Sequence, residues 1–277
     1  MGEKVTIAAL HGMKRGAKKI VGVVAWDFQI AKIADRAGVD IVSVGDSVGM
    51  NLWGREDPED MTLDEMILVG RAVRGGVSRA LVSVDFPYGV LQQGAAAALA
   101  AARRVMSDTG ADMVKLDEAA GFPDAVRAIA DAGIPVFAQM GITQGNAGKY
   151  GIEHAQLLGG AIQVPKEMAA RLVEEAKLLE KSGAVLIDFT SSGPVAGPMV
   201  TQAVTIPVVG GLGGGPWLDG RMRMAHAAIG YGANFLESKT ETYANVARVT
   251  LEALSSYAED VRAARQIKGG IPVKPAA

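Results

Sequence analysis

The chain has 277 residues and a formal charge of −2 at pH 7, with 28 Lys and Arg against 30 Asp and Glu. Scattered basic residues and only 5% aromatic residues argue against a nucleic-acid partner, which needs basic clusters and stacking side chains. No cysteine is present, which excludes disulfides, thiolate zinc sites and a cysteine nucleophile. The amino terminus lacks a signal-peptide pattern, and no apolar run approaches the roughly 20 residues that cross a bilayer. We therefore expect a cytoplasmic protein with no membrane partner.

Apolar runs that are typical of buried strands alternate with helical patterns along the chain. Short motifs such as Gly110-Ala111-Asp112 place glycine where a predicted helix ends and the chain turns back toward the next strand. The predicted strands are 20–25, 41–45, 80–84, 113–116, 136–140, 185–189, 207–211 and 234–237. Eight strand–helix units predict an α/β fold, a (β/α)8 TIM barrel.

No linker or shift in composition divides the chain, so we expect one barrel domain over residues 1–277. Residues 1–18 form an N-terminal extension in which a helix could close the bottom of the barrel or contact another subunit. Thr62-Leu63-Asp64-Glu65 is a capping box that opens a predicted helix ending near Arg74. The glycine-rich segment 141–162 is a candidate lid, and an oligomer contact is the alternative.

Polar residues gather at the carboxyl ends of the predicted strands. They are Trp26, Asp27, Asp46, Ser47, Asp85, Lys115, Asp117, Glu118, Gln139, Asp188 and Thr190. Several carboxylates on one rim repel each other unless a positive charge lies among them, and an all-oxygen set favours Mg²⁺. The three histidines fall away from the strand ends, so zinc is not expected. Residues 210–215 are rich in glycine but lack the lysine and hydroxyl of a phosphate-binding loop.

Several of these segments resemble the ketopantoate hydroxymethyltransferase (3-methyl-2-oxobutanoate hydroxymethyltransferase) family, of the phosphoenolpyruvate mutase and isocitrate lyase superfamily. The resemblance covers roughly residues 19–230. It rests on Val44-Gly45-Asp46-Ser47-Val48-Gly49-Met50, Met61-Thr62-Leu63, Arg71-Ala72-Val73-Arg74-Gly75, Asp85-Phe86-Pro87, Val114-Lys115-Leu116-Asp117 and Asp219-Gly220.

The resemblance implies that Asp46 and Asp85 bind Mg²⁺, helped by an acidic residue at the position of Asp117. It implies that Ser47 and Lys115 hold the carboxylate of a 2-oxo acid chelated by the metal. The implied reaction removes a proton from C3 to give a metal-stabilised enolate, which attacks a one-carbon unit carried by methylenetetrahydrofolate. A homo-oligomer is also implied.

The chain departs from the family pattern at four positions. Asp117 replaces a glutamate, and the adjacent Glu118 is a further candidate metal ligand. Gln139 replaces a histidine, and Trp26 replaces a tyrosine in the substrate site. Thr190 stands where the family has the glutamate that acts as base. Asp188 lies two residues earlier on the same side of the strand, where it could act through water or be a packed polar residue.

Three functions are consistent with this pattern. The first is hydroxymethyl transfer to 3-methyl-2-oxobutanoate. The second is a 2-oxo acid aldolase or lyase that acts on a different substrate without folate. The third is a non-catalytic homologue that binds an oxo acid or serves as a scaffold, an alternative suggested by the missing glutamate.

Overall fold

The computed structural model describes residues 3–56, 60–143, 146–152, 166–211 and 214–270. Its contacts group the chain into two compact units, Met1–Ala225 and His226–Ala277. The predicted single domain over residues 1–277 stays a prediction, and the two units are described in turn.

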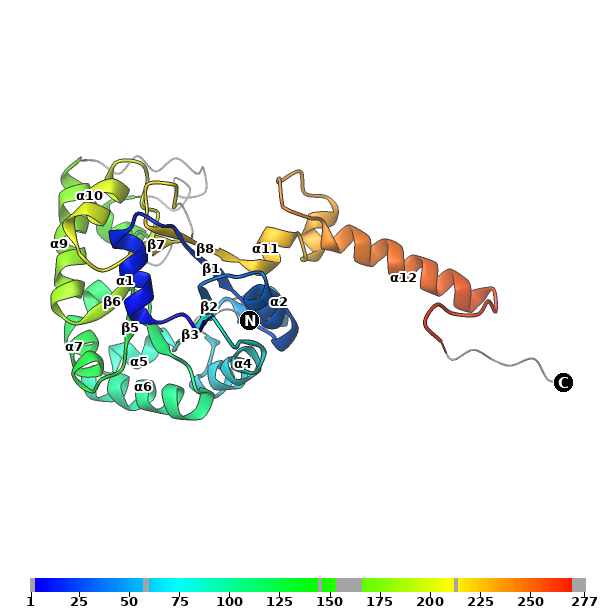
Figure 1. Cartoon of the computed structure of the whole chain (residues 1–277), viewed down its shortest axis with the longest axis horizontal. Coiled ribbons are helices and arrows are strands. Elements are labelled where there is room, and N and C mark those ends of the chain that lie inside the picture. Colours follow the sequence, from blue (N-terminus) through cyan, green and yellow to red (C-terminus); the bar gives the residue numbers. More distant parts are fainter. Residues whose placement is uncertain (1–2, 57–59, 144–145, 153–165, 212–213, 271–277) are drawn as a thin grey trace. The chain divides into compact units, whose positions relative to one another are not determined.

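Eight parallel strands close the first unit into a barrel in the order β1 to β8. The ring closes where Ile20 of β1 is paired with Gly220 of β8. The predicted α/β fold with a (β/α)8 TIM barrel is therefore confirmed (Figure 1). The strands are β1 (Ile20–Val24), β2 (Ile41–Val44), β3 (Leu81–Asp85), β4 (Met113–Leu116), β5 (Val136–Gly141), β6 (Ala184–Thr190), β7 (Val208–Gly210) and β8 (Gly220–Met224).

The eighth strand lies earlier in the chain than the sequence predicted. Residues 234–237 were expected as the strand, but Ala233–Leu236 form a 3₁₀ helix, η4. The described part of the connection between β7 and β8 forms no helix. In β8, buried Met222 alternates with the exposed Arg221 and Arg223, the two-residue period of a strand with one face in the core. Two arginines in five residues hide that strand from a search for apolar runs.

The N-terminal extension packs against the barrel interior. Helix α1 (Ile7–Arg15) buries Leu10 in a cluster with the first inward-facing residues of the strands, among them Ile41 and Phe137. His11 Nε2 lies 2.8 Å from the carbonyl oxygen of Val185, and Lys14 Nζ lies 2.9 Å from the Asp219 carboxylate. The helix therefore closes the amino-terminal end of the barrel, one of its two predicted positions (Figure 1).

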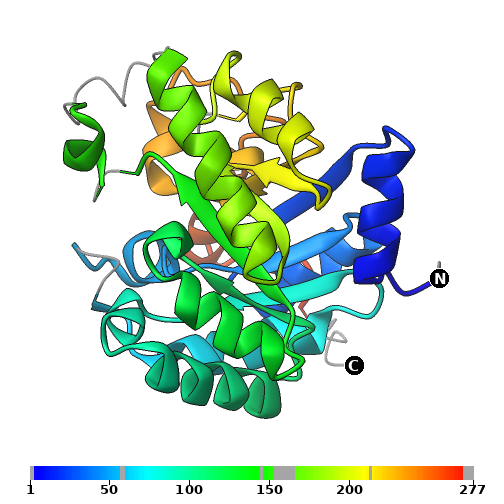
Figure 2. The ribbon, with the colours of Figure 1, turned by 90° about the vertical axis from the view of Figure 1, so that its left-hand side faces the viewer.

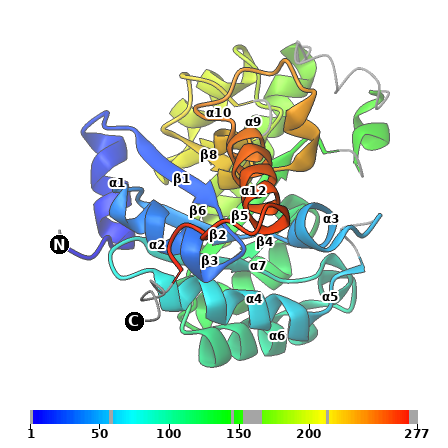
Figure 3. The same cartoon turned by 90° about the vertical axis from the view of Figure 1, so that its right-hand side faces the viewer.

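Helices cover the outside of the barrel. The longer ones are α2 (Phe28–Arg36), α4 (Leu63–Gly76), α6 (Ala95–Thr109), α7 (Pro123–Asp131), α9 (Lys166–Lys181) and α10 (Ala196–Ala203). Helices α4 and α6 lie side by side (Figure 3), and α9 lies over β5 and β6 (Figure 2). The capping box at Thr62 and Glu65 is formed as predicted.

Short helices follow four of the strands, either directly or after a short loop. They are α3 (Val48–Trp53), α5 (Tyr88–Gln92) and the 3₁₀ helices η2 (Ala119–Gly121) and η3 (Ala147–Tyr150). The second unit contains η4 and α12 (Val246–Arg262), after α11 (Ala225–Ile229) at its start. In the described part of the chain, no helix has the length and apolar character required to span a membrane.

Candidate active site

Polar side chains occupy the part of the barrel interior that is nearer the carboxyl ends of the strands. The apolar layer that packs against α1 fills the part nearer their amino ends. Successive residues of a strand face opposite sides, so the second residue after each inward core residue also points inward. These positions hold Ser43 and Ser83, whose hydroxyls are 2.6 Å apart, and Lys115, Gln139 and Asp188. The polar layer therefore lies just below the carboxyl ends of the strands, where (β/α)8 enzymes have their active sites.

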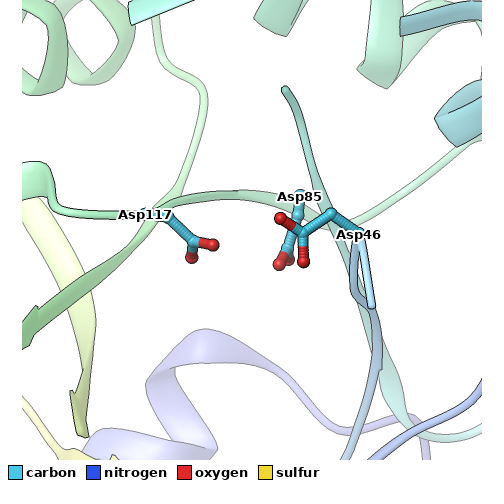
Figure 4. Close-up of side chains that lie close together, drawn as sticks. All are labelled: Asp46, Asp85 and Asp117. Atoms are coloured by element: carbon cyan, nitrogen blue, oxygen red, sulfur yellow. The ribbon is translucent and has the colours of Figure 1, made fainter. Parts of the chain in front are cut away.

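Three carboxylates converge at this end of the barrel (Figure 4). Asp46 follows β2, Asp85 ends β3 and Asp117 follows β4. Each offers an oxygen atom, and these atoms all lie within 4.8 Å of one another. The parallel barrel brings the strand ends together, so residues far apart in the sequence form one acidic cluster, which we define as Asp46, Asp85 and Asp117.

Lys115 supplies a positive charge inside the acidic cluster. Its Nζ lies 2.8 Å from Asp85 Oδ2 and 2.5 Å from Asp117 Oδ1. Burial alone would lower the pKa of Lys115, but the carboxylates of Asp117 and Asp85 raise it well above its usual range. Lys115 pairs with two of the three carboxylates of the cluster. Burial raises the pKa of Asp85 well above its usual range despite the attraction of Lys115. The carboxylates of the cluster therefore outnumber its one ammonium group, and a further cation would be bound favourably there.

The donor atoms of the acidic cluster fit a hard divalent cation. All three residues offer carboxylate oxygens, the ligand type that Mg²⁺ and Ca²⁺ prefer. Among the described residues, the buried Oδ1 of Asp85 has no hydrogen-bond partner, although such atoms are normally satisfied. Asp46, Asp85 and Asp117 could therefore hold a metal ion.

Glu118 lies outside this cluster. Its backbone has a left-handed conformation with φ of 48°, and its N–H donates to Gln139 Oε1 at 3.3 Å. Its carboxylate accepts from Thr143 Oγ1 at 3.1 Å and lies 3.4 Å from Lys149 Nζ. The structure therefore brings together three of the four predicted metal ligands and turns the fourth toward the loop after β5.

Ser47, which follows β2, lies beside the acidic cluster. A Cβ added to Gly45 would lie 3.1 Å from Ser47 Oγ and 3.8 Å from Asp85 Oδ2, so the hydroxyl and the carboxylate flank the same glycine. Trp26 is buried in the main hydrophobic cluster after β1. The adjacent Asp27 accepts from the N–H of Ile30 and caps α2. Glycine at position 45 leaves this space open beside the carboxylates.

Asp188 lies inside the barrel on β6, paired in register with Gln139 of β5 and Val209 of β7. Burial raises its pKa to about 6, against the attraction of Lys115 and a hydrogen bond from the backbone of Gly211. Its Oδ1 is buried and has no hydrogen-bond partner among the described residues. A carboxyl with a pKa near neutrality is suited to exchange protons.

Thr190 ends β6, two residues above Asp188 on the same face, and is buried. The next residue, Ser191, has φ of 55° and begins the loop to α10. The sequence did not single out a second group of side chains near this end of the barrel, around Tyr150, Arg171 and Glu175. Arg171 and Glu175 stand four residues apart on α9, a spacing that could have indicated their contact.

A closed parallel barrel with carboxylates and a buried lysine at its strand ends defines a (β/α)8 enzyme. A family model described as ketopantoate hydroxymethyltransferase matches residues 4–266. The chain belongs to this family. Curated relatives named 3-methyl-2-oxobutanoate hydroxymethyltransferase include one from Parabacteroides distasonis, 35% identical with 94% of this chain and 92% of that protein covered. Another, from Geobacillus kaustophilus, is 34% identical, with 90% and 87% covered. The chain is therefore an enzyme of a transferase family.

Solved structures share the barrel fold at low sequence identity. A phosphonopyruvate hydrolase is 14% identical, with a TM-score of 0.61, 97% of this chain and 92% of the other covered. A 2,3-dimethylmalate lyase, described as a member of the PEP mutase/isocitrate lyase superfamily, is 10% identical, with a TM-score of 0.59 and 98% and 93% covered. These similarities show the fold alone.

Proposed function

We propose that this protein is a Mg²⁺-dependent hydroxymethyltransferase that adds a one-carbon unit from methylenetetrahydrofolate to C3 of 3-methyl-2-oxobutanoate. The family supports hydroxymethyl transfer to a 2-oxo acid. The acidic cluster with Lys115 is the observation that carries the proposal, because it combines a cation site with a positive group for a small acid. A solved phosphonopyruvate hydrolase complex holds oxalate and Mg²⁺, with a TM-score of 0.60 and 12% identity.

Asp46, Asp85 and Asp117 would hold the ion, and Glu118 would join them only if its side chain turned away from Thr143. When bound, Mg²⁺ supplies positive charge that stabilises negative charge developing on the keto oxygen. Lys115 and the Ser47 hydroxyl bind the substrate carboxylate at the same end of the barrel. Trp26, two residues after β1, is proposed to contact the substrate at this end of the barrel.

Asp188 is the group we assign as base. The reaction needs the C3 proton to leave while its electron pair moves toward the keto group. Asp188 is buried inside the barrel, has a pKa of about 6 and has a free carboxylate oxygen among the described residues. Asp188 lies two residues before Thr190 on β6 and is therefore farther from the carboxyl end of the strand. We propose that a water held by Thr190 and Gln139 carries the proton between C3 and Asp188.

The overall transfer balances with one water. A bond forms between C3 and the methylene carbon, and both carbon–nitrogen bonds of the methylene bridge break. Water supplies the hydroxyl oxygen of the product. The two nitrogens of the carrier receive the C3 proton and one proton of that water.

The direct test is product formation. The protein is incubated with 3-methyl-2-oxobutanoate, methylenetetrahydrofolate and Mg²⁺, and ketopantoate is measured by mass spectrometry, with EDTA as the control. Product that disappears with EDTA supports the proposal. Metal and oxo-acid binding without product would contradict it.

Thr190 at the position of the family's glutamate favours one alternative, a 2-oxo acid aldolase or lyase that works without folate. That enzyme would turn over an oxo acid with a free aldehyde at the same rate whether or not the carrier is present. A non-catalytic homologue would show neither reaction. Calorimetric titrations of Mg²⁺ and of the oxo acid then separate a protein that binds oxo acid from a scaffold, which would bind neither.

A further inference from the structure

The segment after β2 carries two residues of the candidate site, Asp46 and Ser47, and continues directly into α3. Both residues are only partly buried. Helix α3 has six residues, and a helix of this length is not stable in water by itself. Contacts made further along the chain are therefore needed to hold Asp46 and Ser47 in place.

Backbone hydrogen bonds connect Asp46 to Arg55 through Gly49. The N–H of Gly49 donates to the carbonyl oxygen of Asp46 at 3.0 Å, and the Gly49 carbonyl oxygen accepts from the N–H of Arg55 at 2.9 Å. Gly49 is buried, and a Cβ added there would lie 2.9 Å from Met61 Sδ and 3.4 Å from Arg55 Cδ. The first turn of α3 therefore lies directly against Arg55 and Met61.

The side chain of Arg55 joins this segment to the start of α4. Its two terminal nitrogens bind the two carboxylate oxygens of Glu65, with 3.1 Å between Nη1 and Oε2 and a second contact between Nη2 and Oε1. Nη1 also donates to the carbonyl oxygen of Asp60 at 2.8 Å. Both side chains of the ion pair are less than a third exposed. A contact through two hydrogen bonds fixes direction as well as distance.

Glu65 is itself held firmly on α4. Its Oε2 accepts from the N–H of Thr62 at 2.9 Å in the capping box, and the next two residues, Met66 and Ile67, are buried in the main hydrophobic cluster. The hydrogen bond from Arg55, followed by that from the Thr62 backbone, lowers the pKa of Glu65 to about 2. Glu65 is therefore ionised and able to pair with Arg55 at any pH well above 2.

We propose that Arg55 is a positioning residue that determines where Asp46 and Ser47 lie in the candidate site, an inference that rests on the function proposed above. Arg55 ties the end of α3 to α4, and the hydrogen bonds through Gly49 transmit this constraint to the backbone of Asp46. The assigned base, Asp188, lies on β6 and outside this segment. Loss of the Arg55 contact should therefore weaken binding of the metal and the oxo acid without changing proton transfer.

The test compares Arg55→Met with the wild type in the full chain. Calorimetry gives the Mg²⁺ affinity, and C3 proton exchange in D₂O gives the KM for the oxo acid and the maximum rate. Arg55→Met is expected to weaken Mg²⁺ binding and to raise the KM by about tenfold each, the lower end of the range for residues that orient metal ligands. The maximum rate and its pH midpoint near 6 should stay as in the wild type.

Arg104→Met is the matched control. Arg104 lies on α6 and pairs with Asp64, the residue before Glu65, so this variant also removes an arginine contact to the first turn of α4. It leaves the segment between β2 and α4 untouched, and wild-type Mg²⁺ affinity and KM are expected. Circular dichroism checks that each variant is folded.

Glu65→Gln changes the other partner and should weaken Mg²⁺ binding in the same direction. If Arg55→Met does not fold, Glu65→Gln provides the test. Since both changes break one interaction, the double variant should lose no more Mg²⁺ affinity than Arg55→Met alone. Losses that add up in the double variant would overturn the Arg55–Glu65 pair as the cause.

Wild-type Mg²⁺ affinity and KM in Arg55→Met would overturn the positioning role, as would an equal loss in Arg104→Met. With wild-type exchange intact, either result leaves the proposed function standing. A wild-type protein that binds Mg²⁺ but does not exchange the proton would contradict the proposed function, and weaker Mg²⁺ binding in Arg55→Met alone would still support the positioning role. A wild-type protein that binds no Mg²⁺ would contradict both.

Discussion

Lys115 of β4 reaches Asp85 of the neighbouring strand β3, with 2.8 Å between Nζ and Oδ2, and both side chains are less than a tenth exposed. Removing one partner of a buried pair leaves the other charge uncompensated. In this protein, the loss of Lys115 would leave the whole acidic cluster without its internal cation.

Lys115→Met is therefore expected to lower the free energy of unfolding by on the order of 3 kcal/mol without Mg²⁺, and by less with Mg²⁺, because the ion then compensates the carboxylates. Urea unfolding with and without Mg²⁺ measures both values. Lys177→Met, in an exposed pair with Glu174, should change the free energy by less than about 1 kcal/mol. An equal loss with and without the ion would contradict a cation at this cluster.

Asp85→Asn is expected to weaken Mg²⁺ binding at least about 100-fold. Changing a residue that only hydrogen-bonds to a metal ligand already lowers metal affinity about 10- to 100-fold, and Asp85 is proposed as a ligand itself. The amide keeps the shape of the side chain but not its charge, so the fold should survive. Calorimetry gives the affinity. Asp64→Asn, whose side chain is 75% exposed, serves as the control with unchanged affinity. Wild-type affinity in Asp85→Asn would rule out this residue as a ligand.

Asp188→Asn is expected to slow C3 proton exchange by roughly 10² to 10⁴-fold, as for the loss of a general base. Asp188 acts in its ionised form, and its pKa is raised to about 6, so wild-type exchange should fall about tenfold per pH unit below 6 and level off above it. The charged groups facing it are Lys115 and Asp117. Thr190→Val should keep a midpoint near pH 6. A similar pH profile in Asp188→Asn would assign the base elsewhere.

Asp35 supports the fold away from the site. Its carboxylate accepts from the N–H groups of Ser78, Arg79 and Ala80, at 3.0, 3.0 and 2.7 Å, and from the Ser78 hydroxyl. Burial would raise the pKa of Asp35, but the hydrogen bonds, led by those from Ala80 and Ser78, lower it overall. The stabilisation is therefore present above the unfolded pKa and lost as the pH falls through the lowered folded value.

Asp35→Asn is expected to lose about 2–3 kcal/mol of unfolding free energy at pH 7 and clearly less near pH 3. Urea unfolding at the two pH values measures the difference. Asp108→Asn, in a partly exposed pair with Arg104, should show little change at either pH. The same loss at pH 3 and pH 7 would mean that the charge of Asp35 is not what these N–H groups stabilise.

Most of the fold could be predicted from the sequence because buried parallel strands are continuous apolar runs. Residues 113–116 match β4, and 41–45 differs from β2 by one residue. The exception is β8, where Arg221 and Arg223 face away from the core. Their exposure depends on which helices cover the strand, and this is a tertiary property that a local pattern does not contain.

The acidic cluster could be predicted for a related reason, because carboxylates at parallel strand ends must meet once the barrel closes. Glu118 could not be placed in the same way. Its direction depends on a positive φ and on contacts with Gln139, Thr143 and Lys149 from another strand and its loop. The predicted homo-oligomer stays a prediction. The candidate lid at 141–162 also stays a prediction, and much of it lies outside the described residues.

The most direct measurement is exchange of the C3 proton of 3-methyl-2-oxobutanoate in D₂O with Mg²⁺, followed by NMR. It reports on the acidic cluster, Lys115 and the base without any donor. We expect exchange well above a control without enzyme, abolished by EDTA and strongly reduced in Asp188→Asn. No exchange, with Mg²⁺ and the oxo acid both bound, would contradict an enolising site in this barrel.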